Sequence, residues 1–320
     1  MTVQLQKAKS RLENIRRVQP ILAALRTISL GSWQMARNRR AGLSAYTARL
    51  LELLAVVVPY VAEERGAHRT ALRSLLGRQR LRPTETEVGV PQRSVVALVV
   101  GSERGLCGGY NKVLLKRLDD YVAGLESGCD LTLVASGSRT VRDLKTAGYE
   151  LAWTHTSSIT ALPSFELAYR WVSDWLQRYE SHELDAVDLL YNADQGAGRY
   201  GATVTRLLPP ELPESSVTAP RETGLAASQD HVIVETDPVG LYVRIVEQWT
   251  AIALYRLLLE AASTEHSARY QLMESATQNA EDLVEELMLA VQSARRQAIT
   301  RQVQELAVGA GLLSHQAPND

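Results

Sequence analysis

The chain has 320 residues, which is enough for one large domain or two. Its formal net charge of −1 at pH 7 gives no indication of a nucleic-acid-binding protein. Two cysteines, Cys107 and Cys129, are too few for a disulfide framework. The N-terminus is polar and has no apolar core of about 7–15 residues, so we expect no secretory signal. The longest apolar run has about ten residues, half of what a bilayer requires, so we expect no membrane-spanning segment.

The charge is distributed unevenly between the two ends of the chain. Residues 1–60 contain ten basic and two acidic side chains, whereas residues 235–310 contain six basic and eleven acidic ones. The two segments therefore carry about +8 and −5 and attract each other at long range. Each exposed ion pair between them contributes only about 0–1 kcal/mol, so the charge favours pairing without dictating it.

The first segment, residues 3–61, is predicted to be helical. Apolar and small residues recur in alternating steps of three and four over about six heptads. Pro20 and Gly31 interrupt the pattern, and because proline inside a helix costs about 3 kcal/mol, we expect a bend or a new helix start near Gln19. The predicted seam consists of Ile15, Val18, Leu22, Leu25, Ser29, Ser32, Ala36, Arg39, Leu43, Tyr46, Leu50, Leu53 and Val57.

The central part of the chain has the pattern of a mostly parallel sheet. A basic connection with proline and glycine, residues 65–93, precedes it and contains one short predicted helix at 70–76. Short β-type runs then alternate with helical stretches, which is typical of strands joined by crossover helices. The predicted strands are 94–100, 131–136, 186–192 and 203–209, with helices at 112–124, 138–148 and 164–179, a loop at 211–228 and a last strand at 231–235.

The last segment is predicted to be one very long helix. Asp237 can cap its first turn, Pro238 suits the first helical position, and nothing breaks the pattern until Gly309. About seventy residues would span roughly 105 Å, so the helix needs a long partner, and the first segment is the candidate. The alternative is two separate amphipathic helices packed on the sheet domain. The predicted seam on this helix is Met273, Ala276, Ala280, Leu283, Leu287, Ala290 and Ala294.

The stretch "SERGLCGGYN", residues 102–111, lies between a predicted strand and a predicted helix and raises the question of a phosphate site. A P-loop needs a lysine and a hydroxyl after its last glycine, and here Gly108 is followed by Gly109 and Tyr110. The dinucleotide fingerprint Gly-x-Gly-x-x-Gly is also absent. We therefore interpret Gly105, Gly108 and Gly109 as parts of a tight structural turn.

Other candidate sites in the sequence are weak. The six histidines are scattered singly, without the spacing of metal ligands. Cys107 is interpreted as a small buried residue, and the pairs Asp119–Asp120 and Glu285–Glu286 as solvated helix faces. We predict no catalytic residue, no cofactor-binding residue, no metal ligand and no cofactor.

Three stretches together resemble one family, the gamma subunit of F-type ATP synthases. "SERGLCGGYN" resembles the signature turn of that family, and "EHSARYQLMESATQNAEDLVEELMLAVQSARRQAIT" is similar to its C-terminal helix. "NIRRVQPILAAL" matches its N-terminal helix more loosely. The resemblance implies an α/β fold class: a long antiparallel coiled coil of the two terminal helices plus a Rossmann-like, mostly parallel sheet domain. The expected parts are an N-terminal helix at 1–62, a linker at 63–93, the sheet domain at 94–236, a C-terminal helix at 237–309 and a tail at 310–320.

The resemblance also implies a function without chemistry of its own. The family is the central rotor shaft, which stands inside a hexamer of alpha and beta subunits and forces the beta sites through different nucleotide states. Its foot contacts the epsilon subunit and the membrane rotor ring. The chain is thus expected to be a peripheral, non-catalytic subunit at the cytoplasmic face of a bacterial inner membrane, coupled to proton or sodium flow, which the sequence does not distinguish.

Four residues carry over by position to contacts with the beta subunit. Arg296, Gln297 and Thr300 match polar residues that bind a loop of beta near the top of the shaft. Leu25 falls where the family usually has a methionine close to the moving lever of beta. The alternative is that these four residues are ordinary coiled-coil surface.

The N-terminal helix departs from the family pattern. The region "LAALRTISLGSWQMARNRR" lacks the usual Thr-Lys-Ala-Met and the lysines that follow it, and Pro20 and Trp33 are added. These differences put the standard N-terminal contacts to beta in doubt and suggest a divergent paralogue from an alternative or sodium-type F-type ATPase. Two other functions stay open: a gamma-like adaptor or regulator that does not rotate, and a nucleotide-binding enzyme built on the glycine turn.

Overall fold

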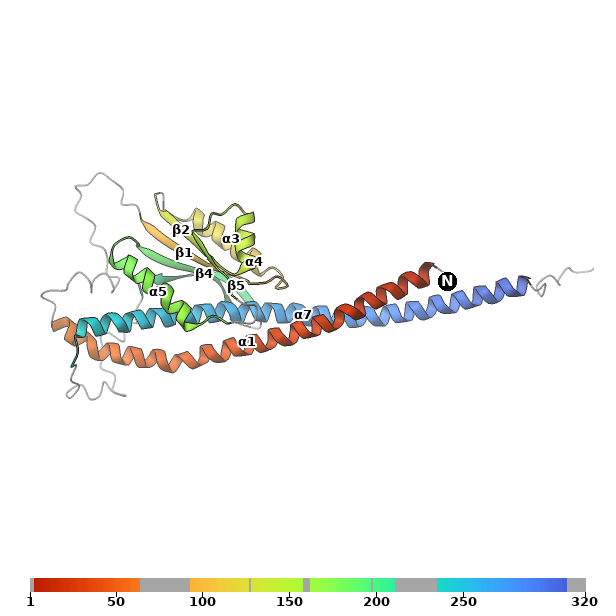
Figure 1. Ribbon diagram of the computed structural model, residues 1–320, viewed down its shortest axis with the longest axis horizontal. Coiled ribbons are helices and arrows are strands. Elements are labelled where there is room, and N and C mark those ends of the chain that lie inside the picture. Colours follow the sequence, from red (N-terminus) through yellow and green to blue (C-terminus); the bar gives the residue numbers. More distant parts are fainter. Residues whose placement is uncertain are drawn as a thin grey trace, which may run out of the picture. The chain divides into compact units, whose positions relative to one another are not determined.

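The computed structural model describes residues 3–63, 93–126, 128–157, 162–196, 198–210 and 235–309 (Figure 1). Two long helices flank the sheet elements in the sequence: α1 (Val3–Glu63) precedes them and α7 (Pro238–Gly309) follows them. The chain divides into two compact units, which we call the coiled-coil unit, residues 1–28 and 270–320, and the sheet unit, residues 29–269. The predicted helix at 70–76, the loop at 211–228 and the strand residues 231–234 lie outside the described residues.

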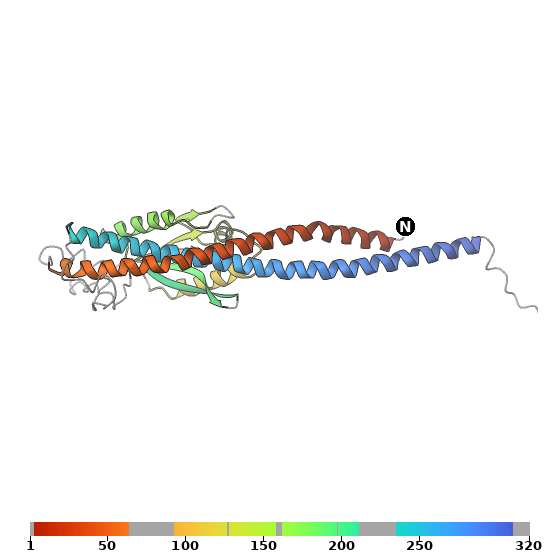
Figure 2. The ribbon, with the colours of Figure 1, turned by 90° about the horizontal axis from the view of Figure 1, so that it is seen from below.

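The helices α1 and α7 run antiparallel within each unit, as predicted. In the coiled-coil unit, Arg26 pairs with Glu274 at 3.1 Å, and Nη2 of Arg16 lies 3.4 Å from Sδ of Met288. Along this series of contacts the residue numbers on α1 fall as those on α7 rise, so the two helices are antiparallel. Figures 1 and 2 both show the two helices side by side within this unit.

The predicted seam on α7 consists of two rows of residues, each with one residue every seven positions. The structure confirms the row that begins at Met273 and corrects the row that begins at Ala276. Leu283 is 37 % exposed and Ala290 is exposed, so neither belongs to the buried face. The second row lies one residue further along the helix. The predicted Ala276 is half-buried and so is confirmed. The other buried and half-buried positions of the two rows are Met273, Ala280, Leu287 and Ala294 in the first row, and Thr277, Val284, Val291 and Ala298 in the second.

The seam on α1 is displaced in the same direction. Val18 in the coiled-coil unit is 45 % exposed, while Gln19 beside it is half-buried. In the sheet unit, the predicted Arg39, Tyr46 and Leu53 are exposed, and the neighbouring Arg40, Thr47 and Leu54 are half-buried or buried instead. The half-buried Leu25 and the buried Ser32 of this row are confirmed as predicted. The other row is confirmed throughout and consists of Ile15, Leu22, Ser29, Ala36, Leu43, Leu50 and Val57.

The reason for this error is the geometry of the helix. At 3.6 residues per turn, positions i+3 and i+4 lie on opposite sides of the row through i, and either can complete a seam. For the second row of each seam, the sequence-based prediction took the positions that continue the apolar pattern. The structure buries the side with Gln19, Arg26 and Arg40, whose long stems cover apolar surface while their polar ends pair with α7 or reach water.

Pro20 does not start a new helix, because α1 is continuous from Val3 to Glu63. A proline removes one backbone hydrogen bond and crowds the carbonyl four residues earlier. Pro20 is exposed, so its ring does not disturb the seam. Pairing along the rest of the long helix outweighs this local cost.

The start of α7 confirms the predicted cap. Asp237 Oδ1 accepts from the Val239 N–H at 3.1 Å, and its Oδ2 accepts from the Gly240 N–H at 2.9 Å. These bonds satisfy two of the amides that a helix leaves without internal partners. The helix then continues to Gly309, as predicted.

The sheet unit contains a five-stranded sheet with the order β3-β2-β1-β4-β5. The first four strands are parallel and β5 is antiparallel to β4, which confirms the mostly parallel sheet. Strand β3 was not predicted, because three residues are too few to show a period. The strands are β1 Ser94–Val100, β2 Asp130–Ser136, β3 Trp153–His155, β4 Ala186–Gly196 and β5 Arg199–Leu208, and the helices between them are α3 Tyr110–Ala123, α4 Ser138–Thr146 and α5 Phe165–Glu180.

Helices cover both faces of the sheet (Figure 1). Alternate residues of β1 point to opposite faces. On one face Ala97 and Val99 pack in a cluster with Leu114 and Leu118 of α3. On the other face the β1 residues Val96, Leu98 and Val100 pack with α5, α1 and α7, through Trp175, Leu54, Val57, Leu254 and Leu258.

Helix α1 contains an 18-residue window with a mean hydropathy of 1.5, long and apolar enough to cross a membrane by composition. Such windows also occur in core helices of soluble proteins. Here Leu54, Val57 and Val61 are buried in the core of the sheet unit. This end of α1 therefore uses its apolar side chains in packing within the sheet unit.

Candidate functional site: the junction between the glycine turn and the last helix

The glycine turn, residues 101–109, joins β1 to α3. Of the three predicted turn glycines, only Gly108 has a left-handed backbone, with φ +62°, while Gly109 has φ −81° and caps α3. Leu106 has φ 62° although it is not a glycine. The backbone angle that favours glycine is therefore present at Gly108 and absent at Gly105 and Gly109.

A glycine with a different role stands at the end of β1. A Cβ atom on Gly101 would lie 2.1 Å from Oγ1 of Thr140, so only glycine fits there. Gly105 and Gly109 have no atom within 4 Å of such a Cβ. The tight approach of α4 thus depends on Gly101 rather than on the glycines singled out from the sequence.

The polar groups of the turn bind protein rather than facing an open cradle. Asn111 Oδ1 accepts from the Ser102 N–H at 3.1 Å, from the Ser102 hydroxyl at 3.0 Å and from the Thr140 hydroxyl at 3.2 Å. The Asn111 amide donates to Asp143 at 2.9 Å. Because these donors and acceptors already have partners, the turn holds α3 and α4 to the sheet.

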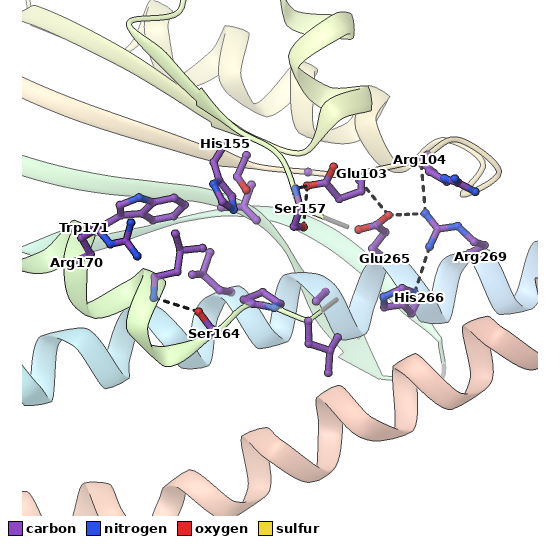
Figure 3. Close-up of a pocket in the computed structure, with 18 residues that line it drawn as sticks. Glu103, Arg104, His155, Ser157, Ser164, Arg170, Trp171, Glu265, His266 and Arg269 are labelled. Carbon is purple, nitrogen blue, oxygen red and sulfur yellow. Dashed lines mark hydrogen bonds and ion pairs between the residues drawn. The ribbon is translucent and has the colours of Figure 1, made fainter. Parts of the chain in front are cut away.

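Arg269 of α7 connects the last helix to the glycine turn. Its side chain is buried and donates to the backbone carbonyls of Gly105 at 3.4 Å and Arg104 at 3.3 Å. It also forms an ion pair with Glu265 and contacts Nδ1 of His266 at 3.2 Å (Figure 3). One guanidinium therefore ties two turns of α7 to the loop after β1.

Glu103 extends this junction to two further elements. Its N–H donates to Oε1 of Glu265 at 3.2 Å. Its own carboxylate accepts from the N–H and hydroxyl of Ser138, at 2.9 and 2.7 Å, and from those of Ser157, at 2.7 and 3.0 Å. Figure 3 shows Glu103 between Ser157 and Glu265.

A second link lies beside the first. The Tyr110 hydroxyl donates to the Ala261 carbonyl of α7 at 3.0 Å, and the Tyr110 ring is fully buried. Cys107 and Ala268 complete a small apolar cluster around it. The glycine turn and the start of α3 thus hold α7 at two places.

Burial determines the charge states at the junction. Burial raises the pKa of Glu265, and the neighbouring Arg269 opposes that rise. Burial, together with Arg269, lowers the pKa of His266 to about 4, so this imidazole is neutral at pH 7. Removing one partner of such a buried ion pair costs about 3–5 kcal/mol, because the other charge is left uncompensated.

The polar groups of this junction attach one element to another. Within the described ranges no three His, Cys, Asp or Glu side chains gather in a way that could hold a metal ion. The charged groups at the junction bind one another and the backbone. What they achieve is a stiff attachment of a long helix to a sheet domain.

The predicted beta-contact residues lie in the coiled-coil unit. Arg296, Gln297 and Thr300 are exposed on neighbouring turns of α7, and the Thr300 hydroxyl donates to the Arg296 carbonyl at 3.1 Å. Leu25 is half-buried on α1, on the turn that holds Arg26, which pairs with Glu274. The structure thus groups the first three and leaves Leu25 several turns away from them. Their role in binding beta stays a prediction.

The sequence reasoning missed Glu103, Glu265 and Arg269. The available signal was the spacing of Glu265 and Arg269, an acid and a base four residues apart on a predicted helix. That spacing is common on exposed helix faces, so it did not indicate a buried pair. The partner Glu103 is distant in the sequence and gave no signal.

Comparisons with known proteins agree with this architecture. The family model described as ATP synthase matches residues 4–313. The ATP synthase gamma chain of Chlorobaculum tepidum is 27 % identical over 313 residues, covering 97 % of this chain and 98 % of the relative. That of Desulfitobacterium hafniense is 28 % identical over 305 residues, covering 95 % and 97 %.

Solved structures show the same fold. The chain resembles one from the OSCP/F1/c-ring structure of Euglena gracilis mitochondrial ATP synthase in rotational state 3, with a TM-score of 0.59 and 13 % identity, over 99 % of this chain and 97 % of that one. A chain from the rotor of the same enzyme, in rotational state 1, gives a TM-score of 0.55 and 14 % identity, over 92 % and 98 %. By its family match, its gamma-chain relatives and its fold, this chain belongs to the ATP synthase family as a member of the gamma-chain group.

Proposed function

We propose that this chain is the central-stalk rotor subunit of an F-type ATP synthase. It couples ion flow through a membrane rotor ring to the conformational cycle of the catalytic beta subunits. Its partners are the alpha and beta subunits of the hexamer, the epsilon subunit and the membrane ring. The chain itself contributes no catalytic group and works through its shape and stiffness.

The observation that carries this proposal is the buried junction of Arg269, Glu265 and Glu103. A rotor must pass torque between its foot and its shaft without slipping. Here the long helix α7 is held to the sheet unit by hydrogen bonds that Glu265 and Arg269 form with the loop after β1. These two side chains also pair with each other within the helix, and both are at most 9 % exposed. Buried, charge-assisted contacts of this kind are stiff and specific.

The surface of the coiled-coil unit supports contact with surrounding subunits. Large apolar side chains that do not pack in the seam remain exposed on both helices, and exposed apolar patches mark interaction sites. They include Val18, Ile21 and Ile28 on α1, and Leu289, Ile299, Val303, Leu306 and Val308 on α7. An apolar shaft surface suits a partner that must bind it and still let it turn.

We place the contacts to beta at Arg296, Gln297, Thr300 and Leu25. The first three present polar groups on an exposed face of α7, beside the exposed Ile299. Leu25 lies on α1 near the Arg26–Glu274 pair. In this assembly the chain is peripheral to a bacterial inner membrane, on its cytoplasmic face, and the coupling ion is a proton or sodium.

Reconstitution tests this function. Mixing the chain with the alpha and beta subunits of the same source should yield a hexamer with one copy of the chain and sustained ATP hydrolysis. Hexamers that form and bind the chain but do not hydrolyse ATP would favour the adaptor or regulator alternative. Failure to assemble with those subunits would contradict the proposal.

A further inference from the structure

A cavity of about 420 Å³ lies at the carboxyl edge of the sheet, inside the sheet unit (Figure 3). The ends of β1, β2 and β3 form one wall, through Val100, Ser136 and His155, and α5 and α7 form the other two. Ligands of open α/β sheets bind outside the carboxyl ends of the strands. The volume falls within the range of about 300–1,000 Å³ that is usual for small-molecule sites.

Most of the cavity wall is apolar. Trp171 of α5 forms a rigid side of it, because its ring packs edge-on against His155, with the ring centroids 5.3 Å apart, and at a tilt against Trp153, with the centroids 5.2 Å apart. Aliphatic side chains from α5 and α7 complete this surface, together with the residues before α5. They are Leu162, Pro163, Leu167, Leu258 and Ala262. Such a wall accepts the apolar body of a ligand.

The inner polar end of the cavity is the carboxylate of Glu265. Its Oε1 accepts from both the Glu103 N–H and Arg269. Within the described part of the chain its Oε2 has no hydrogen-bond donor, and Figure 3 shows this oxygen turned away from Arg269. A carboxylate accepts about four hydrogen bonds, so this one retains capacity for a donor from a ligand.

The charges around the cavity favour a cationic donor. Arg269 is engaged by Glu265, His266 and two backbone carbonyls, and the Glu103 carboxylate lies beside Glu265 and adds negative charge. The other cations, Arg104 and Arg170, stand at the exposed rim, and Arg170 is 72 % exposed and pairs with Glu166. Water and salt screen charges at the rim far more than those inside.

We propose that this cavity binds a small organic cation, whose ammonium group donates to Oε2 of Glu265 and whose apolar body packs on Trp171. The proposal goes beyond the rotor function and does not depend on it. Because the cavity lies between the strand ends and α7, a bound cation adds a contact at the place where the last helix is attached. A bound cation at this site can thus stiffen the attachment of α7 to the sheet.

Titration of the purified full chain with three probes of similar shape tests whether the cavity prefers a cationic ligand. The probes are 2-phenylethylammonium, 2-phenylethanol and phenylacetate. The ammonium should bind about tenfold more tightly than the alcohol, as expected for one charge-assisted hydrogen bond, and phenylacetate should bind most weakly. Equal affinities for the three probes, or tighter binding of phenylacetate, would overturn the proposal.

The position of the site is tested by nuclear magnetic resonance of the tryptophan indole groups, assigned with Trp171→Phe. Binding should shift the Trp171 signal and leave that of Trp33 unchanged. Glu265→Gln should lower the ammonium affinity to that of the alcohol, whereas the matched control Glu274→Gln, on the same helix outside the cavity, should leave it unchanged. If Glu265→Gln does not fold, Ala262→Leu serves instead, since it fills the cavity and should weaken all three probes. Unchanged binding in both cavity variants, or a shift at Trp33 alone, would refute the site.

Discussion

The hydroxyl of Tyr110 donates to the backbone carbonyl of Ala261 at 3.0 Å, so the first residue of α3 holds the first half of the last helix. The ring around this hydroxyl is fully buried. Tyr110→Phe keeps the ring and removes only the hydrogen bond. We expect the free energy of unfolding to fall by about 0.5–1.5 kcal/mol, measured by urea denaturation. Tyr46→Phe, at an exposed ring, is the control and should change it by less than about 0.5 kcal/mol.

Replacing Arg269 with glutamine removes the cation of the buried junction. The carboxylate of Glu265 then stays buried without its partner, and we expect a loss of about 3–5 kcal/mol in the free energy of unfolding. Arg301→Gln removes an exposed cation four residues from Glu305 and should cost less than about 1 kcal/mol. Equal effects of the two substitutions in denaturant titrations would show that the junction is not a buried ion pair.

His266 makes the stability of the sheet unit depend on pH. Its pKa is lowered to about 4 in the folded chain, from 6.5, so the folded state binds fewer protons between these values than the unfolded state. Its contribution is present above about pH 6.5 and is lost as the pH falls toward 4, by at most about 3 kcal/mol. Glu265, whose pKa is raised, acts in the opposite direction.

Comparison of variants separates the contribution of His266 to the pH dependence of stability from that of Glu265. His266→Asn should flatten the loss of stability between pH 6.5 and 4, measured as urea midpoints across that range. His182→Asn, at a turn histidine after α5, is the control and should leave the slope unchanged. A His266→Asn variant with the slope of the unmodified chain would contradict the assignment.

The displaced seam predicts opposite behaviour for two leucines on one helix. Leu287 is half-buried in the seam, whereas Leu283 is 37 % exposed outside it. Leu287→Ala should lower the free energy of unfolding of the chain by about 1–2 kcal/mol, and Leu283→Ala by less than about 0.5 kcal/mol. Leu283→Ala should instead weaken assembly with alpha and beta, measured by size-exclusion chromatography. Equal losses of stability in the two variants would instead support the seam predicted from the sequence, which contains both leucines.

Features encoded within a few residues were predictable from the sequence. The cap at Asp237 predicted the beginning of α7, and the apolar run at 94–100 predicted strand β1, because their signals are local. The choice between Leu283 and Val284 for the seam was not predictable, since it depends on the partner helix. The junction of Glu103 with Glu265 was not predictable either, because it joins residues 162 positions apart.

Rotation of the chain inside its hexamer is the most direct test of the central claim. A bead attached through Asp120→Cys, an exposed position on α3, in a Cys129→Ser background would report it on surface-fixed complexes with alpha and beta. On addition of ATP, the account predicts that the bead turns in one direction, in three steps per revolution. Sustained ATP hydrolysis by complexes whose beads stay fixed would contradict it.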